Sequence, residues 1–115
     1  MDITTTEAGS VTIVELPGDK LDASNANDCK DTLHPVIDQH DKVVVDLSQL
    51  GFIDSSGLGA LLSCLRRQTS SGGELKLCGL SKSIRALFEL VRMHRVFDIH
   101  NTREEALAAS QGAGG

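Results

Sequence analysis

The sequence predicts an α/β domain in which a mixed, mostly parallel sheet of four to five strands is flanked by about four helices. From Val43 onward, short strands alternate with helices, a pattern that requires right-handed crossovers and parallel strands. Val43 to Leu47 is apolar at nearly every position, as in a strand buried on both faces. The 115 residues, of which 40% are hydrophobic, fit one globular domain.

The first part of the chain predicts a hairpin and a helix ahead of that buried strand. Val11 to Leu16 is β-branched and stops at Pro17-Gly18, and the weaker segment Ile3 to Glu7 is expected to pair with it at the sheet edge. Ser24 is expected to cap the helix, and Pro35 to kink or break it. The apolar positions of this helix, close to helical spacing, are Ala26, Cys29, Leu33, Val36 and Ile37.

The rest of the chain predicts three helices and two strands. The helix after the buried strand ends near Ser71 to Gly73, and Glu74 to Cys78 alternates as a strand does. Ser81 caps the next helix, Val96 to Ile99 forms a last short strand, and Thr102 to Glu105 is a capping box that opens the final helix. The two predicted apolar stripes are Leu58, Leu61, Leu62 and Leu65, then Ile84, Leu87, Phe88 and Val91. We expect the domain to span residues 1–110 and a flexible Gly-rich tail to span 111–115.

Composition argues against several classes of function. The net charge is −5 and there is no Trp or Tyr, which disfavours nucleic-acid binding through cationic patches or base stacking. Residues 1–54 carry −8 and residues 55–115 carry +3, an asymmetry that a solvated acidic surface would also explain. Scattered histidines and three widely spaced cysteines predict no metal site and reduced core thiols. No apolar run reaches ~18 residues and no signal peptide is visible, so we expect a cytoplasmic protein without membrane insertion.

The segment Asp54-Ser55-Ser56-Gly57-Leu58-Gly59 follows the buried strand and opens the next helix. The first N–H groups of a helix have no intrahelical partner, so this place favours an anion. Ser, Asp and Gly are also ordinary helix-start residues, and a simple cap is the alternative interpretation. One cap needs one side-chain oxygen, however, and three such side chains are present. Function in open α/β sheets also collects beyond the carboxyl ends of strands.

Enzymatic motifs do not fit these residues. A hydrolase nucleophile elbow built on Ser55 would need glycine where Ile53 stands, and no phosphate-binding loop or dinucleotide fingerprint is complete. A small serine hydrolase that uses Ser55 with His34 or His94 is the enzymatic alternative. A serine that is no nucleophile, at a place suited to an anion, is consistent with a serine that receives a phosphate.

The chain closely resembles the anti-sigma factor antagonists of the STAS-domain family. The resemblance rests on Val43-Val44-Val45-Asp46-Leu47-Ser48 and on Phe52-Ile53-Asp54-Ser55-Ser56-Gly57-Leu58-Gly59-Ala60-Leu61-Leu62. Three other segments are similar to the rest of that domain: Gly73 to Leu77, Ile84 to Phe88 and Arg95 to Phe97. The resemblance covers nearly the whole chain and implies the STAS-domain fold.

The resemblance also implies a regulatory role rather than an enzymatic one. Ser55 occupies the position that accepts phosphate from the kinase domain of an anti-sigma factor, and Ser56 that of a more structural serine. Leu21-Asp22 is similar to an acidic loop beside the phosphoacceptor. The unphosphorylated chain would bind the anti-sigma factor and free its sigma factor, and phosphate on Ser55 would release it. The partner-binding residues implied are Asp22, Asp54, Ser56, Gly57, Leu58 and Gly59.

No cofactor of its own is implied, because ATP and Mg²⁺ would belong to the kinase partner; a phosphoserine phosphatase would be a further partner. The main alternative is an accessory subunit that docks on a membrane transporter, such as a phospholipid-transport ATPase.

Overall fold

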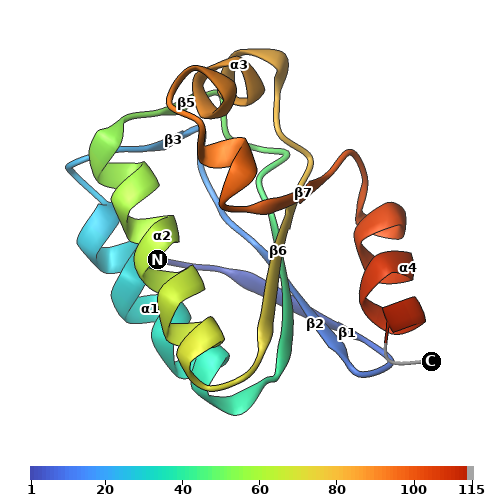
Figure 1. The fold of residues 1–115 in the computed structure, drawn as a ribbon. Helices are drawn as coiled ribbons and strands as arrows, with labels where there is room; N and C mark the ends of the chain where they lie inside the picture. The colour runs from blue at the N-terminus through green and yellow to red at the C-terminus, as the bar shows by residue number, and fades with distance from the viewer. Residues whose placement is uncertain (114–115) are drawn as a thin grey trace.

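Five strands form the central sheet, in the order β1-β2-β4-β6-β7 (Figure 1). The computed structural model of the chain describes residues 1–113, and side chains as far as Ser110. The antiparallel hairpin of β1 and β2 stands at one edge, as predicted, and the remaining neighbours are parallel. The strands are β1 (Thr4–Ala8), β2 (Val11–Glu15), β4 (Lys42–Asp46), β6 (Glu74–Cys78) and β7 (Asp98–His100).

Two very short strands, which the sequence did not predict, form a separate parallel pair. They are β3 (Lys20–Leu21) and β5 (Phe52–Ile53), in which Leu21 lies opposite Ile53. Gly51 and Phe52 also donate backbone hydrogen bonds to the carbonyl of Asp19, at 2.8 and 3.2 Å. A strand of two residues has no usable periodicity, so only the fold reveals this pair.

Helices cover both faces of the sheet (Figure 1). α1 (Ala26–Gln39) and α2 (Ser55–Ser70) pack side by side on one face, and α4 (Arg103–Ala113) covers the other. α3 (Lys82–Leu90) and the 3₁₀ helix η1 (Met93–Arg95) complete the chain between β6 and β7. In β4, Val43 and Val45 join the core beneath α1 and α2, while Val44 joins Ala106 of α4. The prediction of a strand buried on both faces is therefore confirmed.

The apolar side of α2 is rotated from the predicted leucine stripe. Leu61 is buried, but Leu58, Leu62 and Leu65 are only half-buried. The other buried positions of the helix are Gly57, Ala60, Cys64 and Gln68. The half-buried leucines pack at the edge of the core instead of at its centre.

The N-cap of α1 and the effect of Pro35 on its length differ from the predictions. Asn25, rather than Ser24, is the N-cap, because the Ser24 hydroxyl donates to Asp22 Oδ1 at 2.5 Å instead of capping the helix. Of the kink or early break expected at Pro35, the early break does not occur, since α1 continues to Gln39. Pro35 and Asp31 both lie on the exposed side, where water can bind the Asp31 carbonyl that loses its N–H partner.

The C-terminal region keeps the predicted elements with shifted boundaries. The last strand begins at Asp98, two residues later than predicted, because Phe97 packs into the core against Phe88 at a ring distance of 5.7 Å. Thr102 Oγ1 accepts from the Glu105 amide at 3.1 Å, whereas the Glu105 carboxylate accepts from the amide of Asn101 at 3.3 Å. α4 extends to Ala113, so residues 111–113 of the expected tail are helical, and 114–115 lie outside the described residues.

None of the helices in the described part of the chain combines the length and the apolar character that crossing a membrane would require.

Candidate functional site

The start of α2 and the segment around Asp22 are held together by the short β3–β5 pair. β5 leads directly into α2, and the amide of Asp54 donates to the Leu21 carbonyl at 3.2 Å. Leu21 and Ile53 are both buried. The structure therefore brings Asp22 and the Asp54–Gly59 segment together at one end of the molecule (Figure 1).

Asp54 is the N-cap of α2. Its Oδ1 accepts from the Gly57 amide at 3.0 Å, and its Oδ2 accepts from the Ala23 amide at 3.3 Å. One carboxylate thus satisfies an orphan donor of the helix and ties the Asp22 segment to it.

The hydroxyls of Ser55 and Ser56 are not needed for the cap. Neither hydroxyl makes a hydrogen bond within the described residues, and the Gly57 amide already has Asp54 as its acceptor. Ser55 is exposed as the first residue of α2, and Ser56 is half-buried. Ser55 therefore offers an unengaged hydroxyl at a helix N-terminus, where the helix dipole favours negative charge.

Asp22 is fixed in a local network. Its Oδ1 accepts from the amide and hydroxyl of Ser24 at 2.9 and 2.5 Å, and its own amide donates to Asn25 Oδ1 at 2.9 Å. The Ser24 hydroxyl lowers the pKa of Asp22 below its ordinary value, and the Ser24 amide and Lys20, 3.7 Å away, lower it further. Asp22 is therefore a fixed anion near the start of α2.

The two glycines of the motif have different surroundings. Gly57 is buried, and a Cβ placed there would come too close to the Leu21 carbonyl oxygen and the Ile53 side chain. Gly57 therefore has a packing role in the fold, because it allows α2 to approach β3 and β5 closely. Gly59 is exposed, and a Cβ there would meet nothing within 4 Å.

A polar groove of about 370 Å³ lies between the first turns of α1 and α2. Ser56 and Gly59 line it from α2, while Asn27 and Lys30 line it from α1. Lys30 makes no ion pair within the described residues. Asn27 and Lys30 are not predicted from the sequence, because nothing in the linear pattern places α1 beside the serines. Leu58 is half-buried against the core rather than freely exposed.

The histidines do not lie in hydrogen-bonding contact with Ser55. His34 Nε2 lies 3.4 Å from Ser63 Oγ, in the contact between α1 and α2, and His94 is exposed in η1. Within the described residues, neither makes a hydrogen bond to the Ser55 hydroxyl, as the pairing of a nucleophilic serine with its histidine base would require.

The three cysteines are free and buried, as predicted. Burial raises the pKa of Cys29 to about 11 and those of Cys64 and Cys78 to about 12, so these thiols carry little thiolate at neutral pH. In the described part of the chain, no group of three or more His, Cys, Asp or Glu side chains is arranged to hold a metal ion.

Comparisons with known proteins place the site in context. The STAS-domain family model matches residues 2–106. Over 94 residues the chain is 33% identical to the candidate anti-sigma factor antagonist BtrV of Bordetella bronchiseptica, which covers 81% of each chain. It is 28% identical over 80 residues to the anti-sigma-B factor antagonist of Bacillus subtilis, covering 70% of this chain and 73% of that one.

Solved structures show the same fold. The unphosphorylated form of the anti-sigma factor antagonist SpoIIAA superposes with a TM-score of 0.71 at 21% identity, over 96% of this chain and 99% of that one. The phosphorylated form of SpoIIAA from Bacillus superposes with a TM-score of 0.68, also at 21% identity, over 94% of this chain and 98% of that one.

Proposed function

Because the chain belongs to the STAS-domain family, we propose that it is an anti-sigma factor antagonist whose partner binding is switched by phosphorylation of Ser55. One domain, residues 1–110, would carry the whole switch. In the unphosphorylated state it would bind an anti-sigma factor with a serine kinase domain, in the cytoplasm, and free the sigma factor.

The observation that carries this proposal is the unengaged hydroxyl of Ser55. Asp54 alone caps α2, so the exposed Ser55 hydroxyl has no structural task in the described fold. A kinase can reach it without unfolding the helix. The structures of SpoIIAA in two phosphorylation states give a precedent for such a switch on the same fold.

The chemistry would be supplied by the partner. The Ser55 oxygen would attack the γ-phosphorus of ATP bound to the kinase, ADP would leave, and the hydroxyl proton would pass to a base of the kinase. This chain would supply the nucleophile and its orientation. The product phosphate would lie at the N-terminus of α2, where N–H groups and the helix dipole stabilise an anion.

Release follows from electrostatics at the interface. Phosphate adds about −1.5 to −2 charges next to the carboxylates of Asp22 and Asp54. Changing occupancy from 99:1 to 1:99 requires about 5.5 kcal/mol of differential binding. Like charges brought together in an interface cost several kcal/mol, so the repulsion from one phosphate is comparable to the required change in binding free energy.

The unphosphorylated surface would consist of exposed or half-buried residues around Ser55. Asp22, Asp54, Ser56, Leu58 and Gly59 would contact the partner. Lys30 and Asn27, across the polar groove, would extend that surface onto α1. A phosphoserine phosphatase would return the chain to its binding-competent state.

The deciding experiment first captures the partner and then measures its affinity. A pull-down from the native cytosol should recover an anti-sigma factor with a kinase domain, and recovery of a membrane-transporter subunit would contradict the proposal.

Titration calorimetry should then show that the phosphorylated chain and Ser55→Asp bind that partner more weakly than the wild type does, whereas Ser55→Ala binds as tightly as the wild type. Because Asp carries one charge, its effect should be partial. Equal affinity of the phosphorylated and unphosphorylated chain would refute electrostatic release.

A further inference from the structure

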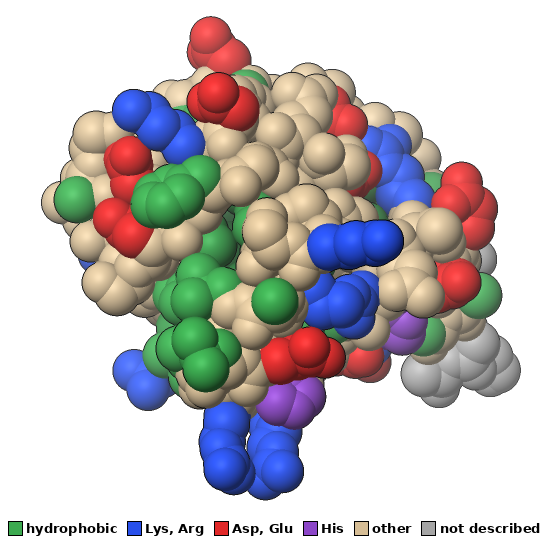
Figure 2. All heavy atoms as spheres, turned by 90° about the horizontal axis from the view of Figure 1, so that it is seen from above, with side chains coloured by type: hydrophobic (Ala, Val, Ile, Leu, Met, Phe, Trp, Pro, Cys, Tyr) green, Lys and Arg blue, Asp and Glu red, His purple; other side chains and the backbone are tan. Residues whose placement is uncertain are grey.

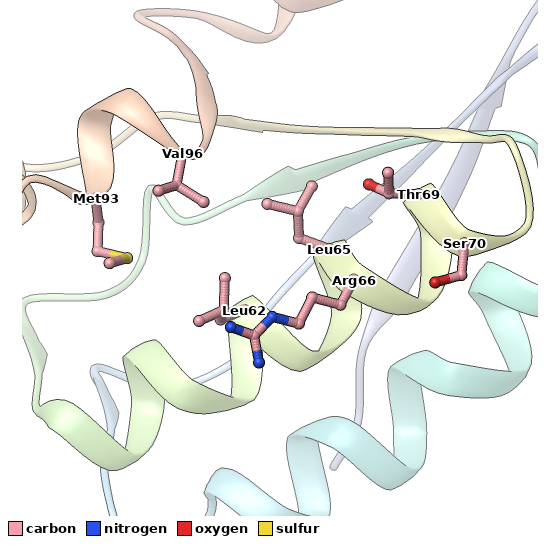
Figure 3. Close-up of a pocket in the computed structure, with 7 residues that line it drawn as sticks. All are labelled: Leu62, Leu65, Arg66, Thr69, Ser70, Met93 and Val96. Carbon is pink, nitrogen blue, oxygen red and sulfur yellow. The ribbon is translucent and has the colours of Figure 1, made fainter.

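A second surface lies along the later turns of α2, away from Ser55. It is a groove of about 510 Å³ between α2 and η1. Figure 3 shows Leu62 and Leu65 of α2 facing Met93 and Val96 across it, with the Arg66 guanidinium beside Leu62. Leu62 lies about 10 Å along the helix axis from Ser55, at about 1.5 Å per residue.

Most of the exposed large apolar side chains belong to the chain segment that supplies Met93 and Val96 to this groove. Four large hydrophobic residues are exposed among the described side chains, and three of them lie between positions 90 and 96. Leu90 is 80% exposed, Val91 42% and Val96 48%. Single exposed apolar residues need no explanation, but a group beside an apolar groove indicates a binding surface.

Unpaired cations lie in the groove lining and in the chain segment that supplies part of it. Arg66 lines the groove, and Arg92 and Arg95 directly precede the lining residues Met93 and Val96 in the sequence. All three are exposed, and none makes an ion pair within the described residues. Arg67 and Arg103, by contrast, are paired with Asp38 and with Glu15 and Asp46. Figure 2 shows hydrophobic side chains gathered beside protruding Lys and Arg on the face that carries α3.

From this arrangement we propose that the groove between α2 and η1 is a docking site for an acidic amphipathic helix of a partner protein. The stretch of α2 from Leu62 to Ser70 is about 12 Å long and would accommodate about two turns of such a helix. The apolar stripe of the helix would cover Leu62, Leu65 and Val96. Its carboxylates would pair with the arginines, an example of helix-in-groove recognition.

Other occupants fit less well. An anionic membrane would meet a concave surface on a chain whose net charge is −5. A second copy would have to supply an acidic helix with a free apolar stripe. The acidic helix α1 buries Cys29, Leu33 and Ile37 in its own core, so that stripe is not available.

The test uses the full chain and a designed helical peptide with Leu at i, i+3, i+4 and i+7 and Glu on the remaining faces. Fluorescence anisotropy should show saturable binding that weakens as salt is added. A peptide of the same composition in scrambled order, which has no apolar stripe, should bind at least tenfold more weakly. No binding at about 1 mM peptide, or equal binding of the scrambled peptide, would overturn the proposal.

Variants then locate the binding. The double substitution Arg66→Glu/Arg95→Glu and the single substitution Val96→Ser should each weaken the peptide at least tenfold, and these positions are exposed, so folding is spared. Lys82→Glu/Arg85→Glu at the first turn of α3 makes the same charge change away from the groove and should leave the affinity unchanged. Equal loss in both double variants would show a non-specific charge effect and overturn the assignment.

Two further measurements separate this proposal from its competitors and from the proposed function. If the chain co-sediments with vesicles rich in anionic lipid, or forms a dimer that the peptide dissociates, the groove has another occupant. Either result would overturn the proposal. Ser55→Asp should not change peptide affinity, because the groove lies beyond the first two turns of α2. The groove could therefore bind the peptide even if Ser55 were never phosphorylated.

Discussion

Two serines stand at the start of each of the helices α2 and α3, and the fold uses these serines differently. At α3, Ser81 Oγ accepts from the Ile84 amide at 3.3 Å, and Ser83 Oγ lies 3.2 Å from Ser81 Oγ. At α2, Asp54 makes the cap, and Ser55 and Ser56 have no hydrogen bond within the described residues. Structural roles therefore account for the serines of α3 and leave those of α2 unexplained. Serine at a helix start is therefore not enough to identify a phosphoacceptor. The proposed phosphoacceptor differs in that its hydroxyl has no hydrogen-bond partner in the described fold.

The largest expected difference between the two helix starts is in phosphorylation. Incubation with ATP, Mg²⁺ and the cognate kinase should add one phosphate, which mass spectrometry should map to Ser55. Ser55→Ala should lose essentially all labelling, while Ser56→Ala and the matched control Ser83→Ala keep it. A phosphate on Ser56, or full labelling of Ser55→Ala, would contradict the assignment.

The next largest effect is the loss of stability expected on substituting Gly57. At Gly57, α2 lies close to β3, and the start of α3 has no corresponding glycine. Gly57→Ala would press a Cβ against the Leu21 carbonyl, which the backbone can relieve only by shifting. We expect the free energy of unfolding to fall by about 1–3 kcal/mol. Urea denaturation measures this, and an unchanged midpoint would show that the two segments are not in such close contact.

The N-caps of α2 and α3 should differ by a smaller amount in their contribution to the free energy of unfolding. Ser81→Ala should cost about 0.5–2 kcal/mol of stability, as loss of an N-cap does. Asp54→Ala should cost more, because it also removes the hydrogen bond to the Ala23 amide, worth about 0.5–1.5 kcal/mol. Ser55→Ala is the control and should stay within about 0.5 kcal/mol of wild type. Denaturant titration of the three variants would contradict this interpretation if Ser55→Ala proved as destabilising as Asp54→Ala.

Gly59 separates the binding surface from the helix that carries it. Its exposed position leaves room for a methyl group, so Gly59→Ala should raise stability by up to about 1 kcal/mol through helix propensity. If a partner approaches α2 closely here, the same change should weaken partner binding about tenfold, or about 1.4 kcal/mol. Thermal denaturation and calorimetric titration test the two effects separately. A stabilised variant with unchanged affinity would place the interface elsewhere.

The smallest expected effect concerns Asp22, in the segment that contacts the start of α2. The pKa of Asp22 is lowered in the folded chain, chiefly by the Ser24 hydroxyl. Its stabilising contribution is therefore present above its ordinary pKa of 3.8 and lost as pH falls through the lower folded value. NMR titration should show the pKa of Asp22 rising toward its ordinary value in Ser24→Ala. An unchanged pKa would show that the hydroxyl does not hold the carboxylate in solution.

Much of the fold could be predicted from the sequence because the signals are local. The hairpin at the edge, the buried strand at Val43–Val45 and the caps at Ser81 and Thr102 depend on residues within a few positions of one another. The start of α2 is also local: Asp54, Ser55 and Ser56 lie directly before the helix or in its first turn. The Asp54–Gly59 segment could therefore be recognised in the linear pattern.

The tertiary structure determines the contacts and the exposure of each of these residues. Asp54 reaches Ala23, 31 positions earlier, and this contact, with the pairing of Leu21 and Ile53, sets Asp22 beside α2. The same packing buries Gly57 and leaves Gly59 open. The groove between α2 and η1 joins residues about 30 positions apart. The sequence by itself determined the elements and the serine motif, because hydrogen bonds within a turn and apolar periodicity are encoded locally. Which hydroxyl stays unengaged, which glycine is exposed and which surface is grooved depend on contacts between distant segments, and only the folded chain makes those contacts.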